Sequence, residues 1–120
     1  MKTIAVIATS IALLAAHNAS AQRRVTPGAF MEIMGSVQAY AELCDNLVVD
    51  DTGMQQAAMA NNINQTAFDD AGNQAKLTGQ YQMMIQSAES YTNRDFFCGN
   101  GLVEFGTDGV NFPGLLKETN

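Results

Sequence analysis

Histidine is almost absent from this sequence, since His17 is the only one in 120 residues. Imidazole is the usual base that activates serine and cysteine nucleophiles, and it is a common ligand of zinc and copper. His17 also lies in a segment that we expect to be removed, which would leave the remaining chain without imidazole. We therefore expect a protein that is not an enzyme, with no catalytic residue, no bound metal and no cofactor.

Basic side chains are scarce as well. Six Lys and Arg residues stand against twelve Asp and Glu residues, which gives a formal net charge of −6. Such a chain has no basic surface that could neutralise phosphates, so we expect no nucleic-acid partner. The same charge balance argues against peripheral binding to anionic membranes.

Long apolar runs are also missing. The longest spans residues 4–16, or 13 residues, whereas a membrane-spanning helix needs about 20. It follows Lys2 and precedes Ala19-Ser20-Ala21, which is the three-part pattern of a secretory signal. We predict that residues 1–21 are a signal peptide cleaved after Ala21, and that residues 22–120 form one small secreted or periplasmic domain without stable membrane insertion. Retention of the segment as a membrane anchor is the alternative.

Two cysteines are present, Cys44 and Cys98. Export would place them in an oxidising compartment, where an isolated pair usually forms a disulfide. That bridge would close a loop of about 55 residues and contribute roughly 4 kcal/mol in the chain-entropy model. Two free buried thiols or a bridge between two chains are the alternatives. The wide separation excludes a C-x-x-C redox motif and zinc-finger spacing.

The first predicted helix begins with Thr26 as N-cap and Pro27 as first helical residue. Apolar residues then recur at three- and four-residue steps, as one stripe of an amphipathic helix. The members of the stripe are Phe30, Ile33, Met34, Val37, Ala41, Cys44 and Val48.

Two further helices are predicted in the middle of the chain. Residues 50–53 break the first helix, and Asp51 or Thr52 caps a shorter one that ends near Asn61. The third helix starts at residues 69–70, whose carboxylates favour a helix N-terminus, and runs to about residue 91. Gly72 and Gly79 either weaken this helix or permit the close approach of a neighbour.

The last thirty residues fit two structures. Phe97, Cys98, Leu102 and Phe105 match a fourth helix ending at Gly106, whereas residues 102–112 also match a strand-turn-strand hairpin. A lone hairpin needs packing support to be stable, and we favour the helix. The predicted fold is thus an all-α bundle of three or four helices with one disulfide, with residues 112–116 lying across it. The alternative is an α+β fold with a C-terminal hairpin at 102–112.

Methionine supplies the candidate binding surface, which consists of Met31, Met34, Met83 and Met84. Unbranched thioether side chains repack easily against varied partners. The alternative is that these residues fill gaps in a core. A separate motif, Asn64-Gln65-Thr66, is an acceptor for N-linked glycosylation in a eukaryotic host, and the sequence leaves open whether Asn64 is modified.

The segment Cys44-Asp45-Asn46-Leu47-Val48-Val49-Asp50-Asp51 resembles the start of the periplasmic acid-stress chaperones of the HdeA type. The resemblance implies a small exported helical protein with one long-loop disulfide, although those chaperones are rich in lysine and this chain is not. Phe97-Cys98 and Pro113-Gly114-Leu115-Leu116 also resemble uncharacterised exported proteins of alphaproteobacteria, which implies no particular activity.

These observations favour a non-enzymatic exported protein that binds another exported protein, in the manner of a periplasmic stress chaperone. Mild acid would protonate its carboxylates and weaken their repulsion, so we expect its assembly to depend on pH. A helical carrier of a small apolar ligand is the alternative. The sequence does not identify the partner or the oligomeric state.

Overall fold

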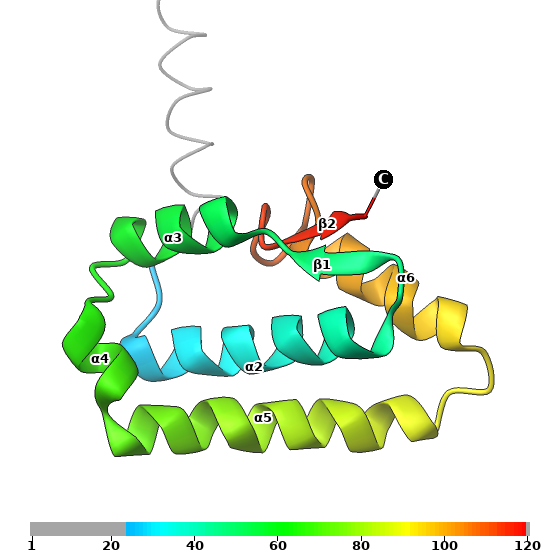
Figure 1. Ribbon diagram of the computed structural model, residues 1–120, viewed down its shortest axis with the longest axis horizontal. Coiled ribbons are helices and arrows are strands. Elements are labelled where there is room, and N and C mark those ends of the chain that lie inside the picture. The colour runs from blue at the N-terminus through cyan, green and yellow to red at the C-terminus, as the bar shows by residue number, and fades with distance from the viewer. Residues whose placement is uncertain (1–23, 120) are drawn as a thin grey trace, which may run out of the picture.

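The computed structural model describes residues 24–119, so the predicted signal peptide at residues 1–21 and its cleavage after Ala21 lie outside the described residues. The described chain is mostly helical and confirms the predicted fold class (Figure 1). Its elements are α2 (Pro27–Leu43), β1 (Leu47–Val49), α3 (Asp51–Ala60), α4 (Gln65–Asp69), α5 (Ala71–Glu89), α6 (Arg94–Phe105) and β2 (Leu116–Glu118). Within residues 24–119, no helix is long and apolar enough to cross a membrane.

Helix α2 lies at the centre of the molecule (Figure 1). Helix α5 runs beside α2 in the same direction, while α3, β1 and β2 cover the opposite side. Helix α6 runs back along the molecule and packs against α2 and β2. The core lies between these layers, and its largest fully buried side chains include Phe30, Phe97, Leu47, Leu115 and Leu116.

The predicted stripe of α2 is correct in its first half and too long in its second. Phe30 and Val37 are buried, but the helix ends at Leu43 and Cys44 is its C-cap. Val48 lies in strand β1, not on the helix. Because neighbours cover α2 on several sides, Tyr40 and other residues outside the predicted stripe are buried too.

Side-chain caps start the helices near where the sequence places them. Thr26 caps α2, with Pro27 in its first turn, as predicted. Asp50 caps α3, because its side chain accepts a hydrogen bond from the backbone N–H of Gly53. The predicted caps, Asp51 and Thr52, are helical instead. Asp70 caps α5 in the same way, through the N–H of Asn73.

Helices α2 and α5 pack closely together at Gly35. A Cβ atom added to Gly35 would lie 2.4 Å from the carbonyl oxygen of Leu77, so only glycine fits this contact. One residue further on, the buried Ser36 hydroxyl accepts a hydrogen bond of 3.0 Å from the Gln80 amide. The suggestion that Gly79 permits close approach is wrong, because a Cβ there would meet nothing within 4 Å. The close contact comes from the glycine of the other helix.

The C-terminal region settles the choice between helix and hairpin. Residues 94–105 form α6, so the alternative hairpin at 102–112 is wrong. The returning backbone donates N–H groups to the last carbonyls of α6, from Val110 to Val103 and from Phe112 to Glu104. These hydrogen bonds satisfy carbonyl groups at the end of α6 that have no partner within the helix. The chain then continues into β2, which pairs antiparallel with β1, with Val48 opposite Lys117.

Candidate binding surface

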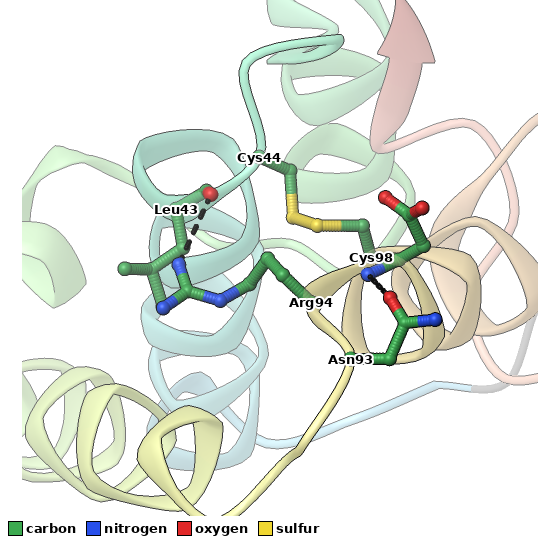
Figure 2. The surroundings of a disulfide bond; sticks show 6 residues. Leu43, Cys44, Asn93, Arg94 and Cys98 are labelled. Atoms are coloured by element: carbon green, nitrogen blue, oxygen red, sulfur yellow. Dashed lines mark hydrogen bonds between the residues drawn. A yellow bond between two sulfur atoms is a disulfide. The ribbon is translucent and has the colours of Figure 1, made fainter.

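A disulfide fastens α6 to the end of α2. Cys44 and Cys98 form the predicted bridge, with a Cα–Cα distance of 5.8 Å, and both residues are buried (Figure 2). Beside it, the Arg94 guanidinium donates a hydrogen bond of 3.4 Å to the carbonyl oxygen of Leu43. Asn93 caps the start of α6 by accepting from the N–H of Asp95. The N-terminal half of α6 is therefore held by a covalent bond as well as by packing.

The inner face of α6 is fixed by aromatic packing. The Tyr40 ring of α2 lies against Gly101, where an added Cβ would be 2.7 Å from a ring carbon. The ring centroid of Tyr40 is 4.6 Å from that of Phe97 and 6.2 Å from that of Phe105. Burial raises the pKa of Tyr40 from 10.0 to about 12, and nearby Glu104 adds to the shift. This contact leaves α6 with one orientation on the core.

The opposite face of α6 is apolar and exposed. Phe96 is 71% exposed and Val103 is 59% exposed, and a Cβ added to Gly99 between them would meet nothing within 4 Å. Phe96, Gly99, Asn100 and Val103 follow one another at steps of three, one and three residues, so they share one side of the helix. We call these four residues the α6 outer face.

Two shallow hollows adjoin each other at Phe96. One, of about 400 Å³, is lined by Asn93, Asp95, Phe96, Gly99, Asn100 and Val103. The other, of about 590 Å³, is lined by Ser87, Ser90, Tyr91, Thr92, Asn93 and Phe96. The Asn100 side-chain amide donates a 3.3 Å hydrogen bond to the Tyr91 hydroxyl, which joins α6 to the loop before it. The Phe96 side chain thus stands between two hollows whose other lining residues are mostly polar.

The sequence of α6 itself carries a signal for this surface. The predicted α6 stripe of Phe97, Cys98, Leu102 and Phe105 is buried or packs against the core. Phe96 and Val103 are the apolar residues of the same helix that lie off this stripe. Apolar residues outside a correctly assigned buried stripe indicate exposed apolar surface.

The four candidate methionines do not form one surface. Met31 has no exposed area at all, so it cannot contact a partner in this structure. Met34 and Met84 are half-buried and pack against the core, whereas Met83 is 63% exposed on α5. The assignment of Met31 failed because α2 is covered on more sides than a peripheral helix of a bundle would be.

A separate apolar groove, away from α6, lies between α3 and α4. Its volume is about 320 Å³, and its lining residues are Met54, Gln55, Ala58, Met59, Ile63, Gln65 and Phe68. None of these side chains is charged. The floor belongs to the core, because Ile63 is buried and Phe68 packs edge-on against Phe30 with centroids 6.4 Å apart.

Asn64, the candidate glycosylation acceptor, is exposed at the start of α4. Its side-chain oxygen accepts a hydrogen bond of 3.1 Å from the N–H of Ala67 and caps the helix. This hydrogen bond uses the oxygen of the side chain, whereas a glycan would be attached to its nitrogen.

Within residues 24–119, no group of three or more His, Cys, Asp or Glu side chains is arranged to hold a metal ion. Comparisons with protein-family models, with curated proteins and with solved structures find no match to this chain. The geometry of the α6 outer face is therefore the main guide to function.

Proposed function

We propose that this protein is a non-enzymatic exported protein that acts by binding another protein, and that the α6 outer face is its contact surface. The observation that carries the proposal is the exposure of Phe96, 71%, on a helix whose other side is held in the core. An aromatic side chain in this position resembles the anchor residues that dominate the energy of protein interfaces.

The rigidity of α6 supports the proposal. The disulfide at Cys98 lies between Phe96 and Val103 in the chain, and Tyr40 packs directly on Gly101. A surface that is already ordered loses little conformational entropy on binding, so more of the contact energy appears as affinity. Full burial of a Phe side chain by a partner contributes roughly 1.5–3 kcal/mol.

The disulfide also supports the exported location, because such bridges persist in oxidising compartments. The predicted signal peptide and cleavage after Ala21 belong to the same proposal. Sequencing the N-terminus of the protein isolated from its host tests them directly. A mature protein that begins at Gln22 supports export with cleavage, and one that begins at Met1 refutes it.

The binding proposal is tested with paired variants. Tagged protein is expressed in its host, captured from the exported fraction, and compared with Phe96→Ser and with Met83→Ser. Both variants remove one exposed apolar side chain, but Met83 belongs to α5 and to the methionine surface that the sequence suggests. We expect Phe96→Ser to lose a co-purifying protein that Met83→Ser retains. Loss with Met83→Ser alone would instead support the methionine surface, and equal retention by both would refute the α6 surface.

A stress-chaperone role is the narrower form of this proposal. Its support is the excess of carboxylates, twelve against six basic residues, whose mutual repulsion weakens as acid protonates them. Size-exclusion chromatography, a dye for exposed apolar surface and a client-aggregation assay are run from neutral pH to about pH 3. We expect a change of oligomer or of exposed apolar surface together with client protection. If all three readings stay constant, the chaperone role is wrong.

A carrier of a small apolar ligand is the second candidate function. The groove between α3 and α4 favours it, because its volume of about 320 Å³ and its uncharged lining suit a small apolar molecule. Native mass spectrometry of protein purified from its host tests the idea. A small-molecule adduct that disappears in Ala58→Gln, which would fill the groove, supports the carrier. A co-purifying polypeptide without such an adduct supports the protein binder.

A further inference from the structure

We infer that the partner segment seated on the α6 outer face is a basic amphipathic helix of another protein. This inference rests on the proposed function, because it names the chemistry of the partner for the same surface. It follows from the shape of the surface and from the charge around it.

The shape suits a helix or another regular segment. Phe96 and Val103 lie about two helical turns apart, roughly 10 Å along the axis of α6. Gly99 between them leaves open space where a side chain would otherwise stand. An apolar side chain of a partner can enter this gap, with Phe96 on one side and Val103 on the other. Such insertion of a knob between flanking side chains is how helices pack together.

The charge around the gap is negative. Asp95 is the one charged residue among those that line the hollow between Phe96 and Val103, and the polar residues beside it, Asn93 and Asn100, are neutral. Arg94, the one basic residue in the sequence of α6, is turned toward α2 and donates to Leu43 (Figure 2). A basic residue beside the partner's apolar anchor would therefore meet Asp95 without competition from Arg94. The negative Asp95 and a positive residue of the partner would then be complementary in charge at the edge of the apolar contact.

A second copy of the same chain fits less well. Twelve acidic residues against six basic ones give every copy the same negative sign, so two copies repel each other at neutral pH. The α6 segment of a second copy would also bring its own Asp95 toward the Asp95 of the first copy. A partner of opposite sign avoids both costs.

The test uses synthetic peptides as probes. One is an amphipathic helix of about 18 residues with leucine on one face and lysine on the other. The second has glutamate in place of lysine, and the third is a scrambled version of the first. Binding of each labelled peptide to the oxidised protein is measured by fluorescence anisotropy at about 50 and about 300 mM NaCl. We expect the Lys/Leu helix to bind at least about tenfold more tightly than the other two, and more weakly at the higher salt.

Matched variants locate the binding. Phe96→Ser should weaken the binding of the Lys/Leu helix about tenfold or more, while Met83→Ser, which removes an exposed methionine on α5, should change it less than about twofold. Asp95→Asn should weaken it by about two- to fivefold. Asp51→Asn is the control for charge, because Asp51 occupies the first turn of α3 as Asp95 occupies the first turn of α6. Phe96 is exposed, so its loss should leave the circular dichroism spectrum unchanged.

Several outcomes would overturn the inference. Equal affinity for the Glu/Leu and Lys/Leu helices would show that the surface does not prefer a basic partner. Equal effects of Phe96→Ser and Met83→Ser would show that a cationic peptide binds this acidic protein without a specific site. Self-association in sedimentation experiments that is abolished by Phe96→Ser would identify a second copy as the occupant.

Failure of the inference can be told from failure of the proposed function. A native partner that is lost with Phe96→Ser but binds Asp95→Asn normally and at high salt keeps the surface and refutes the basic segment. A native partner that binds Phe96→Ser normally refutes the surface itself.

Discussion

Replacement of Gly35 by alanine tests the close contact between α2 and α5. An alanine Cβ would lie 2.4 Å from the carbonyl oxygen of Leu77, whereas ordinary contacts begin at 3.4 Å. The obstacle is backbone, which cannot rotate away as a side chain can. Helices α2 and α5 would therefore have to separate by about 1 Å, which forfeits a quarter to a half of the dispersion energy at the contact.

The magnitude follows from two opposing effects. Alanine in place of glycine stabilises an exposed helix interior by about 1 kcal/mol. Overpacking of a tight contact typically costs about 1–3 kcal/mol, and loss of the hydrogen bond from Gln80 to Ser36 would add about 1 kcal/mol. We expect Gly35→Ala to lower the free energy of unfolding by about 2 kcal/mol.

Gly79→Ala is the matched control, because Gly79 is also helical and an added Cβ there meets nothing within 4 Å. It should raise the free energy of unfolding by about 1 kcal/mol, so the two variants should differ by about 3 kcal/mol. Urea unfolding of the oxidised protein, followed by far-UV circular dichroism, measures both. If Gly35→Ala were as stable as Gly79→Ala, the close packing of α2 on α5 would be wrong.

Three further predictions concern α6 and its attachment. Replacing Cys44 and Cys98 by alanine should lower the free energy of unfolding by about 4 kcal/mol, since the bridge spans 54 residues; a loss under about 1 kcal/mol in urea unfolding would contradict this. Gly101→Ala should destabilise the protein by about 1–2 kcal/mol because it overlaps the Tyr40 ring, while Gly99→Ala should stabilise it by up to about 1 kcal/mol; thermal unfolding that ranks them in the opposite order would refute the contact. Burial raises the pKa of Tyr40 to about 12, so the contribution of the neutral Tyr40 side chain to the free energy of unfolding is complete below pH 10. That contribution should fall by about 2 kcal/mol as the pH rises from 10 to about 12. In an ultraviolet titration, the wild-type protein should show a tyrosinate step near pH 12 that Tyr40→Phe lacks. If the step lost in Tyr40→Phe lay near pH 10 instead, the raised pKa of Tyr40 would be wrong.

The sequence predicted those parts of the fold that depend on local chemistry. Thr26 and Pro27 start α2 because a hydroxyl cap and a fixed φ angle act within one turn. The spacing of Phe97, Cys98 and Phe105 likewise predicts a helix that ends at Gly106, and α6 ends one residue earlier, at Phe105. The disulfide followed from the expected compartment and the presence of just two cysteines.

Other parts depend on contacts between distant residues, which periodicity does not encode. Strand β1 was assigned to the end of the first helix, because Val48 also fits the helical spacing and its partner Lys117 lies far away in the chain. Gly35 was not singled out, since only the position of Leu77 on another helix makes it necessary.

The candidate site shows the same division. Met31 was assigned to a binding surface because methionine is adaptable, yet its burial depends on which sides of α2 are covered. Phe96 was missed although its position off the buried stripe of α6 was visible in the sequence. Assigning the buried stripe first and then asking which apolar residues remain would have found it.

The attachment of α5 has a consequence for motion. Of its nineteen residues only Ala88 is fully buried, and its main neighbour is α2. By contrast, the disulfide and the pairing of β1 with β2 tie the end of α2 to α6 and to the C-terminal strand. Local opening can therefore release α5 while these other parts stay folded, so its amide protons should exchange with solvent faster than those of α2. In that opened state Gly35, Ser36 and the adjoining face of α2 would be exposed, while the Cys44–Cys98 disulfide stays intact.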